Sequence, residues 1–284
     1  MPSSADVARE LYEAFDRADP QALLDVLHAD FVGHVCEGMP YGSGGPHAGP
    51  AAMLTEVWVP MWRRLRVLPV PERFLSCDDG TMVVTGTYRG RPARGAQPLA
   101  AAFAHVLTLR DGRIRELRQI TDTERWAQAA ADADAEVIRR LFTAAEERDR
   151  QAVQDSYAAD VVIREAPSLP YGGVYHGQDG AVRHALAYNA TWDRLQSAED
   201  RRLEPQINGR DGRFVVTWRQ KATAADGRRL DVPVVDLIRV RDGKVASLEM
   251  FPQDTAAVLE FLGHKERSVP ACPGGPPGSP HSIG

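Results

Sequence analysis

The chain has 284 residues, of which 43% are hydrophobic and 26% charged, as in ordinary globular proteins. Its formal net charge of −5 counts against a nucleic-acid or anionic-membrane partner, because such partners usually require a basic face. The three cysteines have no metal-ligand spacing and do not suggest a disulfide framework, and no apolar run reaches the length of a membrane span. We therefore expect a cytoplasmic protein that binds neither nucleic acid nor membrane.

The sequence repeats itself with a period of about 130 residues. Val7–Tyr12 resembles Val137–Phe142, and Pro40–Gly42 is repeated as Pro170–Gly172, each pair with the same offset. The offset drifts by one or two residues further along, where loops absorb insertions at little cost. A period of this length indicates a duplicated domain and not a solenoid, whose units are much shorter.

The first half is predicted, in chain order, to form three helices and five strands. Apolar spacing, a proline in a first turn and runs of alternating residues place helices over 6–18, 20–27 and 51–65, and strands over 31–36, 67–77, 81–88, 99–109 and 113–121. Asp79-Gly80 and Asp111-Gly112 are hairpin turn signals. Helices followed by antiparallel strands indicate an α+β fold and not alternating βαβ units.

The second half repeats this order and ends with an additional helix. Its expected helices are 133–148, 150–158, 178–195 and 254–262, and its expected strands are 161–166, 198–208, 213–223, 230–240 and 244–251. The connection over 123–134 has neither proline nor glycine, so we expect a helix that holds the halves in fixed contact. The expected domains are 1–128 and 129–264, followed by a disordered tail over 265–284 that is rich in proline and glycine.

Two motifs carry a resemblance to a known family. The loop Leu169–Gly173 and the strand pair within Val235–Val245 are similar to the SnoaL-like branch of the NTF2-like superfamily, and the likeness extends over most of residues 5–264. The resemblance implies two cones, each a curved antiparallel sheet wrapped around helices with a deep apolar pocket. Many family members form homodimers through the outer sheet face, so a tandem copy is expected to form an intrachain pseudo-dimer, with a homodimer also allowed.

The resemblance also implies a type of chemistry that uses no metal and no organic cofactor. A base in the pocket removes a proton next to a carbonyl group, and hydrogen-bond donors stabilise the oxyanion. We expect a tailoring enzyme of polyketide or related secondary metabolism that cyclises, isomerises or dehydrates a small apolar, carbonyl-bearing substrate. The alternative is a non-catalytic small-molecule binding or scaffold protein.

Strand alternation selects the first candidate catalytic residues. Asp236 shares a strand face with Val234 and Ile238, which is unusual for a solvated acid, and the matching position in the first half is His105. Both copies therefore keep a titratable group at this position. The competing interpretations are a structural acid with local hydrogen bonds and a structural core histidine.

The strand before the Pro-Tyr-Gly loop gives a second set of candidates. Glu165 shares a face with Ile163, and a pocket acid or a strand-end salt bridge would both fit. In the first half, Val35 replaces this acid, and its neighbour His34 is the remaining titratable candidate.

The candidate substrate-binding residues lie in the two loops and on the helix that follows each loop. We expect Asp236 to be the base, with Glu165, Tyr171 and His176 as partners, and His105, His34 and Tyr41 to serve the first pocket. His47 can reach the first rim, and the matching tryptophans Trp62 and Trp192 can line the pockets. Packed turns, solvated histidines and buried tryptophans are the alternatives.

Overall fold

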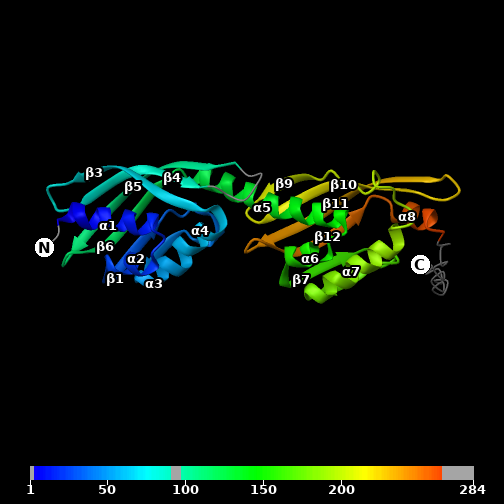
Figure 1. Ribbon diagram of the computed structural model, residues 1–284, viewed down its shortest axis with the longest axis horizontal. Helices are drawn as coiled ribbons and strands as arrows, with labels where there is room; N and C mark the ends of the chain where they lie inside the picture. Colours follow the sequence, from blue (N-terminus) through cyan, green and yellow to red (C-terminus); the bar gives the residue numbers. More distant parts are fainter. Residues whose placement is uncertain (1–2, 91–96, 264–284) are drawn as a thin grey trace, which may run out of the picture.

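The computed structural model describes residues 3–90 and 97–263, which form two α+β domains joined by one long helix (Figure 1). The elements of the first domain are, in order, α1 Ser4–Asp16, α2 Pro20–Asp25, β1 Leu27–Val35, the 3₁₀ turn η1 Pro40–Gly42, β2 Gly45–Ala48, α3 Pro50–Ala52, the π-helical turn η2 Met53–Trp58, α4 Val59–Leu65, β3 Val67–Ser76, β4 Met82–Gly90, β5 Leu99–Arg110 and β6 Arg113–Thr121.

The second domain repeats this order. It consists of α5 Thr123–Glu147, α6 Arg150–Ser156, β7 Tyr157–Glu165, β8 Gly173–His176, α7 Gly177–Trp192, β9 Gln206–Arg210, β10 Arg213–Thr223, β11 Arg229–Arg241, β12 Lys244–Pro252 and α8 Thr255–Phe261. The expected tail, 265–284, lies outside the described residues. Within the described part of the chain, no helix is both long and apolar enough to cross a membrane.

Each domain contains one six-stranded sheet with the same strand order. The orders are β2-β1-β6-β5-β4-β3 and β8-β7-β12-β11-β10-β9. The strands pair antiparallel, as expected, except at one place in each domain, where β1 runs parallel to β6 and β7 runs parallel to β12. Strands β2 and β8 were expected as loop, and each pairs with only one neighbour at the sheet edge.

Local sequence signals explain most element boundaries. Ser3 and Asp6 form a reciprocal capping box that starts α1, whose apolar face is buried in the core. Asp111 adopts a positive φ angle before Gly112, as the Asp111-Gly112 turn signal predicts, and Asp242 does the same before Gly243 in the matching turn of the second domain. The helix expected over 51–65 instead contains the wider η2 turn, and Pro60, which has no N–H to donate, lies just after it.

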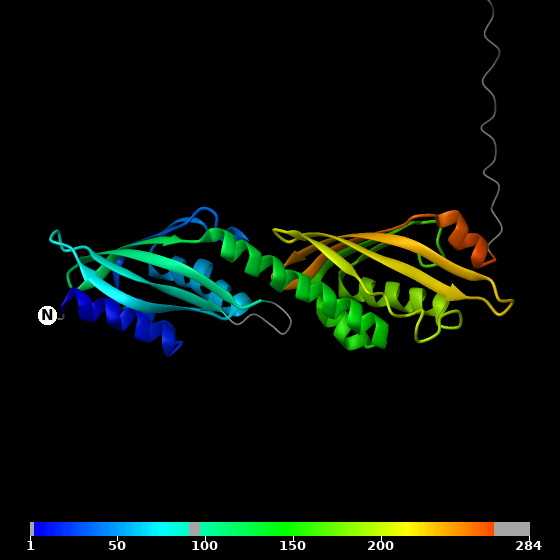
Figure 2. The same ribbon diagram turned by 90° about the horizontal axis from the view of Figure 1, so that it is seen from above.

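Helix α5 makes the connection between the domains, and its helical start confirms the expectation for 123–134. Trp126 and Ala129 pack in the first core, whereas Ile138 and Leu141 pack in the second. The expected boundary at residues 128 and 129 therefore falls inside one continuous helix. The two domains lie end to end along it (Figures 1 and 2).

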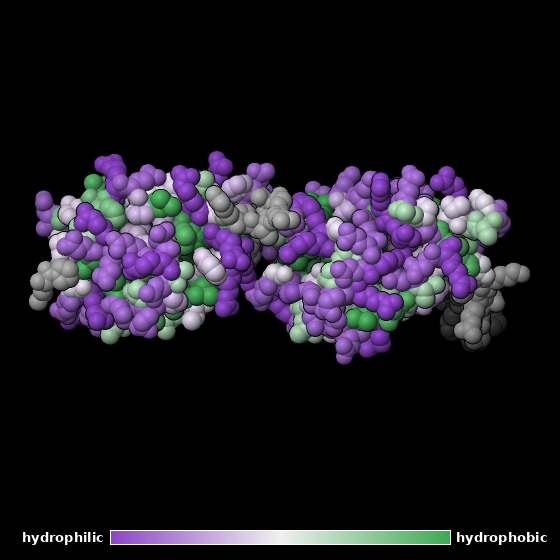
Figure 3. Space-filling model, in the orientation of Figure 1, coloured by the Kyte–Doolittle hydropathy of each residue, from purple (hydrophilic) through white to green (hydrophobic). Residues whose placement is uncertain are grey.

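The end-to-end arrangement differs from the packing of outer sheet faces that the resemblance implies. An ion pair of Arg64 with Asp242 links the domains instead, and Arg210 of β9 pairs with Glu124 at the start of α5, the part of that helix that packs in the first core. The outer sheet faces keep exposed apolar side chains, such as Phe251, which is 50% exposed. Figure 3 shows a largely hydrophilic surface with scattered apolar patches on both domains. The expected homodimer stays a prediction.

Candidate functional site

The second domain contains a cavity of about 130 Å³ between the inner face of its sheet and helices α5, α6 and α7. Leu141, Phe142 and Val153 of the helices and Leu248 of β12 make much of the wall apolar. Polar side chains also line it, and Asp236 is the least exposed of them. An apolar wall with a small number of polar groups is the usual composition of a small-molecule site.

Asp236 lies on β11 opposite Val216 of β10 and Met250 of β12, with its side chain on the inner face. It is only 1% exposed. The indole Nε1–H of Trp218 donates a hydrogen bond of 2.8 Å to Asp236 Oδ2, while Oδ1 is buried and has no partner among the described residues. One oxygen is therefore oriented by the protein, and the other remains available for a ligand.

The environment of Asp236 makes its carboxyl group retain a proton more strongly than an exposed aspartate does. Burial raises the pKa of Asp236 well above its usual value, and the nearby Glu165 carboxylate raises it further. The hydrogen bond from Trp218 acts in the opposite direction. The group can thus take up or release a proton at higher pH than an ordinary aspartate.

Glu165 and His184 form a second titratable pair behind this acid. Glu165, at the end of β7, is buried, and its Oε2 lies 3.4 Å from Nε2 of His184 on α7. Burial raises the pKa of Glu165, although His184 opposes that shift. His184 lines the cavity and contacts Glu165, and the charge of Glu165 in turn raises the pKa of Asp236.

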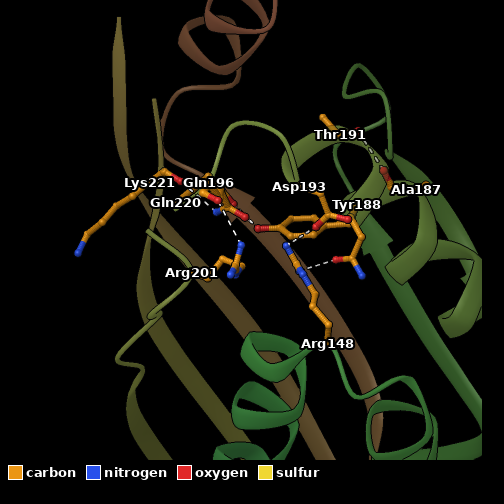
Figure 4. A network of polar contacts seen from close by, with 10 residues as sticks. Arg148, Ala187, Tyr188, Thr191, Asp193, Gln196, Arg201, Gln220 and Lys221 are labelled. Carbon is orange, nitrogen blue, oxygen red and sulfur yellow. Dashed lines mark hydrogen bonds and ion pairs between the residues drawn. The ribbon is translucent and has the colours of Figure 1, made fainter. Parts of the chain in front are cut away.

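Two tyrosines add hydroxyl groups to the same wall. The hydroxyl of Tyr188, one helical turn after His184, donates to Oε1 of Gln220 on β10 (Figure 4). Tyr157 also lines the cavity, and burial together with Asp236 raises the pKa of its hydroxyl. Tyr157 therefore keeps its proton and can serve as a hydrogen-bond donor to a bound oxygen atom.

The first domain contains a corresponding cavity of about 280 Å³, and no buried polar side-chain atom of the residues described in this domain lacks a hydrogen-bond partner. His105 is 3% exposed and lies between two hydroxyls: Nδ1 is 2.8 Å from Tyr12 and Nε2 is 2.6 Å from Tyr88. Gln119 Nε2 donates to Tyr88 at 2.9 Å. Burial lowers the pKa of His105 to about 3, so the ring is neutral near pH 7.

Of the other predicted residues of the first domain, only Trp62 lines the cavity together with His105. His34 is half-buried and 3.3 Å from Glu116, and His47 is paired with Glu56 at 2.9 Å; neither lines the cavity. Tyr41 also lies outside it, beneath the guanidinium of Arg64. Trp62 does line the cavity, at its exposed edge.

In the second domain, Asp236 lines the cavity and Glu165 lies near enough for its charge to act on Asp236, but neither Glu165 nor any of the other candidates belongs to the cavity lining. Tyr171 and Trp192 are buried in an adjacent cluster, with ring centroids 6.2 Å apart. Tyr171 packs edge-on against Tyr188 at 5.1 Å and so supports the wall from behind. His176 is exposed at the end of β8.

Sequence reasoning missed His184, Tyr188 and Trp218. His184 and Tyr188 are four residues apart on a helix, a spacing that places both on one face and could have identified them. Trp218 shares the inner face of β10 with Val216, the residue opposite Asp236, which strand alternation also predicts. Within residues 3–90 and 97–263, no group of three or more His, Cys, Asp or Glu residues is placed to hold a metal ion.

Comparison with known proteins identifies the class to which this fold and cavity belong. The model of the SnoaL-like domain matches twice, at residues 8–117 and 138–248. These stretches cover well over half of the chain, and the chain therefore belongs to the SnoaL-like domain family as two tandem copies. The resemblance stated from the sequence is confirmed.

Individual relatives each match the length of a single domain. The uncharacterized protein Rv0034 of Mycobacterium tuberculosis (strain H37Rv) is 28% identical over 130 residues, which are 46% of this chain and 96% of that protein. An NTF2-like protein of unknown function from Burkholderia pseudomallei is 27% identical, covers 45% of this chain and 98% of its own, and has a TM-score of 0.42.

Two further solved structures have more specific names. TerC, co-crystallized with polyporic acid, is 28% identical, with 44% of this chain and 95% of its own covered and a TM-score of 0.39. A candidate polyketide cyclase from Xanthomonas campestris is 21% identical, with 44% and 95% covered and a TM-score of 0.38.

Proposed function

We propose that the second domain is a cofactor-independent enzyme that moves a proton on a small apolar molecule next to its carbonyl group. A cyclisation, isomerisation or dehydration in polyketide or related secondary metabolism is the corresponding reaction. The observation that carries the proposal is the Asp236 carboxyl group, with one oxygen held by Trp218 and the other unpartnered in an apolar cavity. Buried polar atoms normally have partners, so an unpartnered oxygen in a cavity suggests a role in binding or catalysis.

The proposed chemistry uses Asp236 as the base and the Tyr157 hydroxyl as the hydrogen-bond donor. Ionised Asp236 takes a proton from the carbon next to the carbonyl group, and the negative charge moves to the carbonyl oxygen. The Tyr157 hydroxyl, which lines the same cavity, is placed to donate a hydrogen bond to that oxygen. Protonated Asp236 then gives the proton to another atom of the substrate. In an isomerisation this atom is another carbon, and in a dehydration it is the oxygen of the hydroxyl group that leaves as water.

The raised pKa of Asp236 fits this role. A carboxylate whose conjugate acid holds its proton strongly is a better base than an exposed aspartate. Glu165 contributes by raising that pKa, and His184 holds Glu165 in place. In this scheme Glu165 and His184 are positioning residues, since Glu165 lies outside the cavity lining and His184 acts through Glu165.

The test uses a simple ketone, because proton removal next to a carbonyl group can be followed without the natural substrate. 2-Tetralone in D₂O exchanges its α-protons for deuterium, and nuclear magnetic resonance measures the rate. We expect the protein to accelerate this exchange and Asp236→Asn to lower the acceleration about 10²- to 10⁴-fold, the usual contribution of a positioned base. Circular dichroism should show an unchanged fold.

The matched control is Asp231→Asn on the same strand. Asp231 faces outward and is paired with Arg219 at 2.5 Å, so its loss should leave the exchange rate unchanged. Full exchange activity in Asp236→Asn would contradict the assignment of the base. Binding of 2-tetralone without any acceleration would favour the alternative, a non-catalytic binding protein.

In the first domain, the residues around the cavity favour non-catalytic binding or a structural role. His105 has both ring nitrogens engaged by tyrosine hydroxyls, and its lowered pKa leaves it uncharged. No carboxyl group of the described residues lines this cavity. We therefore propose binding or structural support, without proton transfer, for the first domain.

A further inference from the structure

The mouth of the second cavity differs from its duplicate in charge at matching backbone positions. Arg148 and Arg150, on either side of the start of α6, both line the second cavity. The residues 130 positions earlier are Ala18 and Pro20, and both line the first cavity. Arg148 and Ala18 even share the left-handed backbone conformation, with φ angles of 60° and 50°. The same turn therefore presents two guanidinium groups in one domain and none in the other.

Arg201 brings a third guanidinium group to this mouth from the segment between α7 and β9. It is half-buried, lines the cavity and donates a hydrogen bond of 3.2 Å to the backbone oxygen of Gln196 (Figure 4). Within the described parts of the chain, neither Arg150 nor Arg201 has an ion-pair partner. Two of the three positive charges are therefore not neutralised by a salt bridge.

The third guanidinium group is partly neutralised. Arg148 Nη1 donates to Asn189 at 2.5 Å, and Nη2 lies 2.7 Å from Asp193 Oδ1, although that contact does not have hydrogen-bond geometry (Figure 4). Glu146, the other carboxylate at the mouth, accepts a hydrogen bond from the backbone of Leu203. Three guanidinium groups against these two carboxylates leave one positive charge in excess.

We propose that this mouth, formed by Arg148, Arg150 and Arg201, is a subsite for a carboxylate group of the substrate. One excess positive charge matches a monoanion better than a phosphate dianion, and a planar guanidinium group pairs well with a carboxylate. The apolar part of the molecule then extends inward toward Asp236. The inference rests on the proposed function in treating this anion as part of the substrate, and it adds that the substrate is an acid.

The experiment compares two probes of nearly equal shape, 2-naphthoate and uncharged 2-naphthamide, by isothermal titration calorimetry at low ionic strength. We expect the full chain to bind 2-naphthoate about tenfold more tightly, since hydrogen bonds to charged groups contribute that much or more. Arg201→Gln and Arg148→Ala should each reduce this preference several-fold, and the double variant should remove it. Arg148→Ala introduces the residue that the first domain has at this position.

Arg202→Gln is the control for Arg201→Gln, because Arg202 is the adjacent exposed residue and does not line this cavity. It should keep the preference. Arg201→Gln also covers the case in which Arg148→Ala disturbs folding, since Arg148 holds Asn189 and Asp193. Equal binding of both probes, absence of 2-naphthoate binding, or a full preference in the double variant would each overturn the proposal.

The outcome is separable from the test of the proposed function. Asp236→Asn should lose α-proton exchange and keep the preference for 2-naphthoate, because among the described residues Asp236 has its hydrogen bond from Trp218 and none from the three arginines. If the parent protein did not accelerate α-proton exchange but still preferred 2-naphthoate, the proposed catalysis would be contradicted and the anion subsite would be supported.

Discussion

The two domains each have a titratable side chain at the same place on equivalent strands, His105 on β5 and Asp236 on β11, but only His105 has all of its polar atoms hydrogen-bonded. In the first domain, both nitrogens of His105 are bonded to tyrosine hydroxyls, and the resulting network is closed. In the second, Asp236 Oδ1 and His184 Nε2 are buried without hydrogen-bond partners among the described residues. Unsatisfied buried groups reduce stability, so their presence in only one of two copies supports the proposal that assigns proton transfer to the second domain.

The largest expected effect concerns the matching tryptophans. Trp192 is completely buried, whereas Trp62 is 40% exposed at the edge of the first cavity. We expect Trp192→Ala to lower the free energy of unfolding by about 3 to 5 kcal/mol, as large aromatic truncations in a core do. Trp62→Ala should cost about 1 kcal/mol or less, because its ring keeps much of its contact with water. Urea unfolding followed by circular dichroism measures both.

This pair also shows where sequence reasoning reaches its limit. The offset of 130 residues predicts that Trp62 and Trp192 are equivalent, and both do lie on the helix that follows the loop. Their environments differ because Phe261 of α8 packs against Trp192 with ring centroids 6.4 Å apart, whereas the start of α5, which follows β6 as α8 follows β12, leaves Trp62 40% exposed. A similar cost for both alanine variants would contradict this explanation.

The fold was predictable from the sequence because periodicity and turn signals are local. The duplication, the helical connection and the Asp-Gly hairpins depend on residues near in sequence, and the structure has them. The parallel pairing of β1 with β6 and the end-to-end packing of the domains depend on contacts over long distances, which a single sequence does not show.

The site was predictable only in part, for a related reason. Strand alternation found Asp236 and Glu165 because each lies on an inner face of a strand. Alternation also selected His105, but it could not show that Tyr12, 93 residues earlier, satisfies one of its nitrogens. His34, which was predicted to serve the first pocket, does not line the first cavity, because its side chain lies on the outer face of the sheet next to Glu116.

The next prediction concerns opposite pH dependences in the two domains. The pKa of His105 falls from 6.5 to about 3 on folding, so the unfolded chain binds the proton more strongly. Stability from this group is fully present above pH 6.5 and is lost as the pH falls toward 3, by about 1.4 kcal/mol per pH unit. His105→Gln should remove this loss, so its stability relative to the parent should increase as the pH falls.

Asp236 should act in the other direction. Its pKa is raised on folding, so the folded state binds the proton more strongly, and stability falls as the pH rises above the unfolded value of about 3.9. Asp236→Asn should therefore gain stability relative to the parent as the pH rises. Urea unfolding at several pH values measures both variants. The same direction of change in both would show that the two positions have similar environments in solution.

The smallest effect concerns the hydrogen bond that Trp218 donates to Asp236, the proposed base. The Trp218 indole donates to Asp236 Oδ2 and lowers the pKa of that carboxyl, in opposition to burial. Trp218→Phe keeps an aromatic ring and removes the donor, so the pKa of Asp236 should rise further. The base is active when ionised, and the midpoint of the 2-tetralone exchange rate against pH should move up by about one pH unit. Trp126→Phe, which removes an indole donor to Thr121 in the first domain, should leave the midpoint in place. An unchanged midpoint in Trp218→Phe would mean that a group other than Asp236 accepts the proton, and Glu165 would then be the next residue to test.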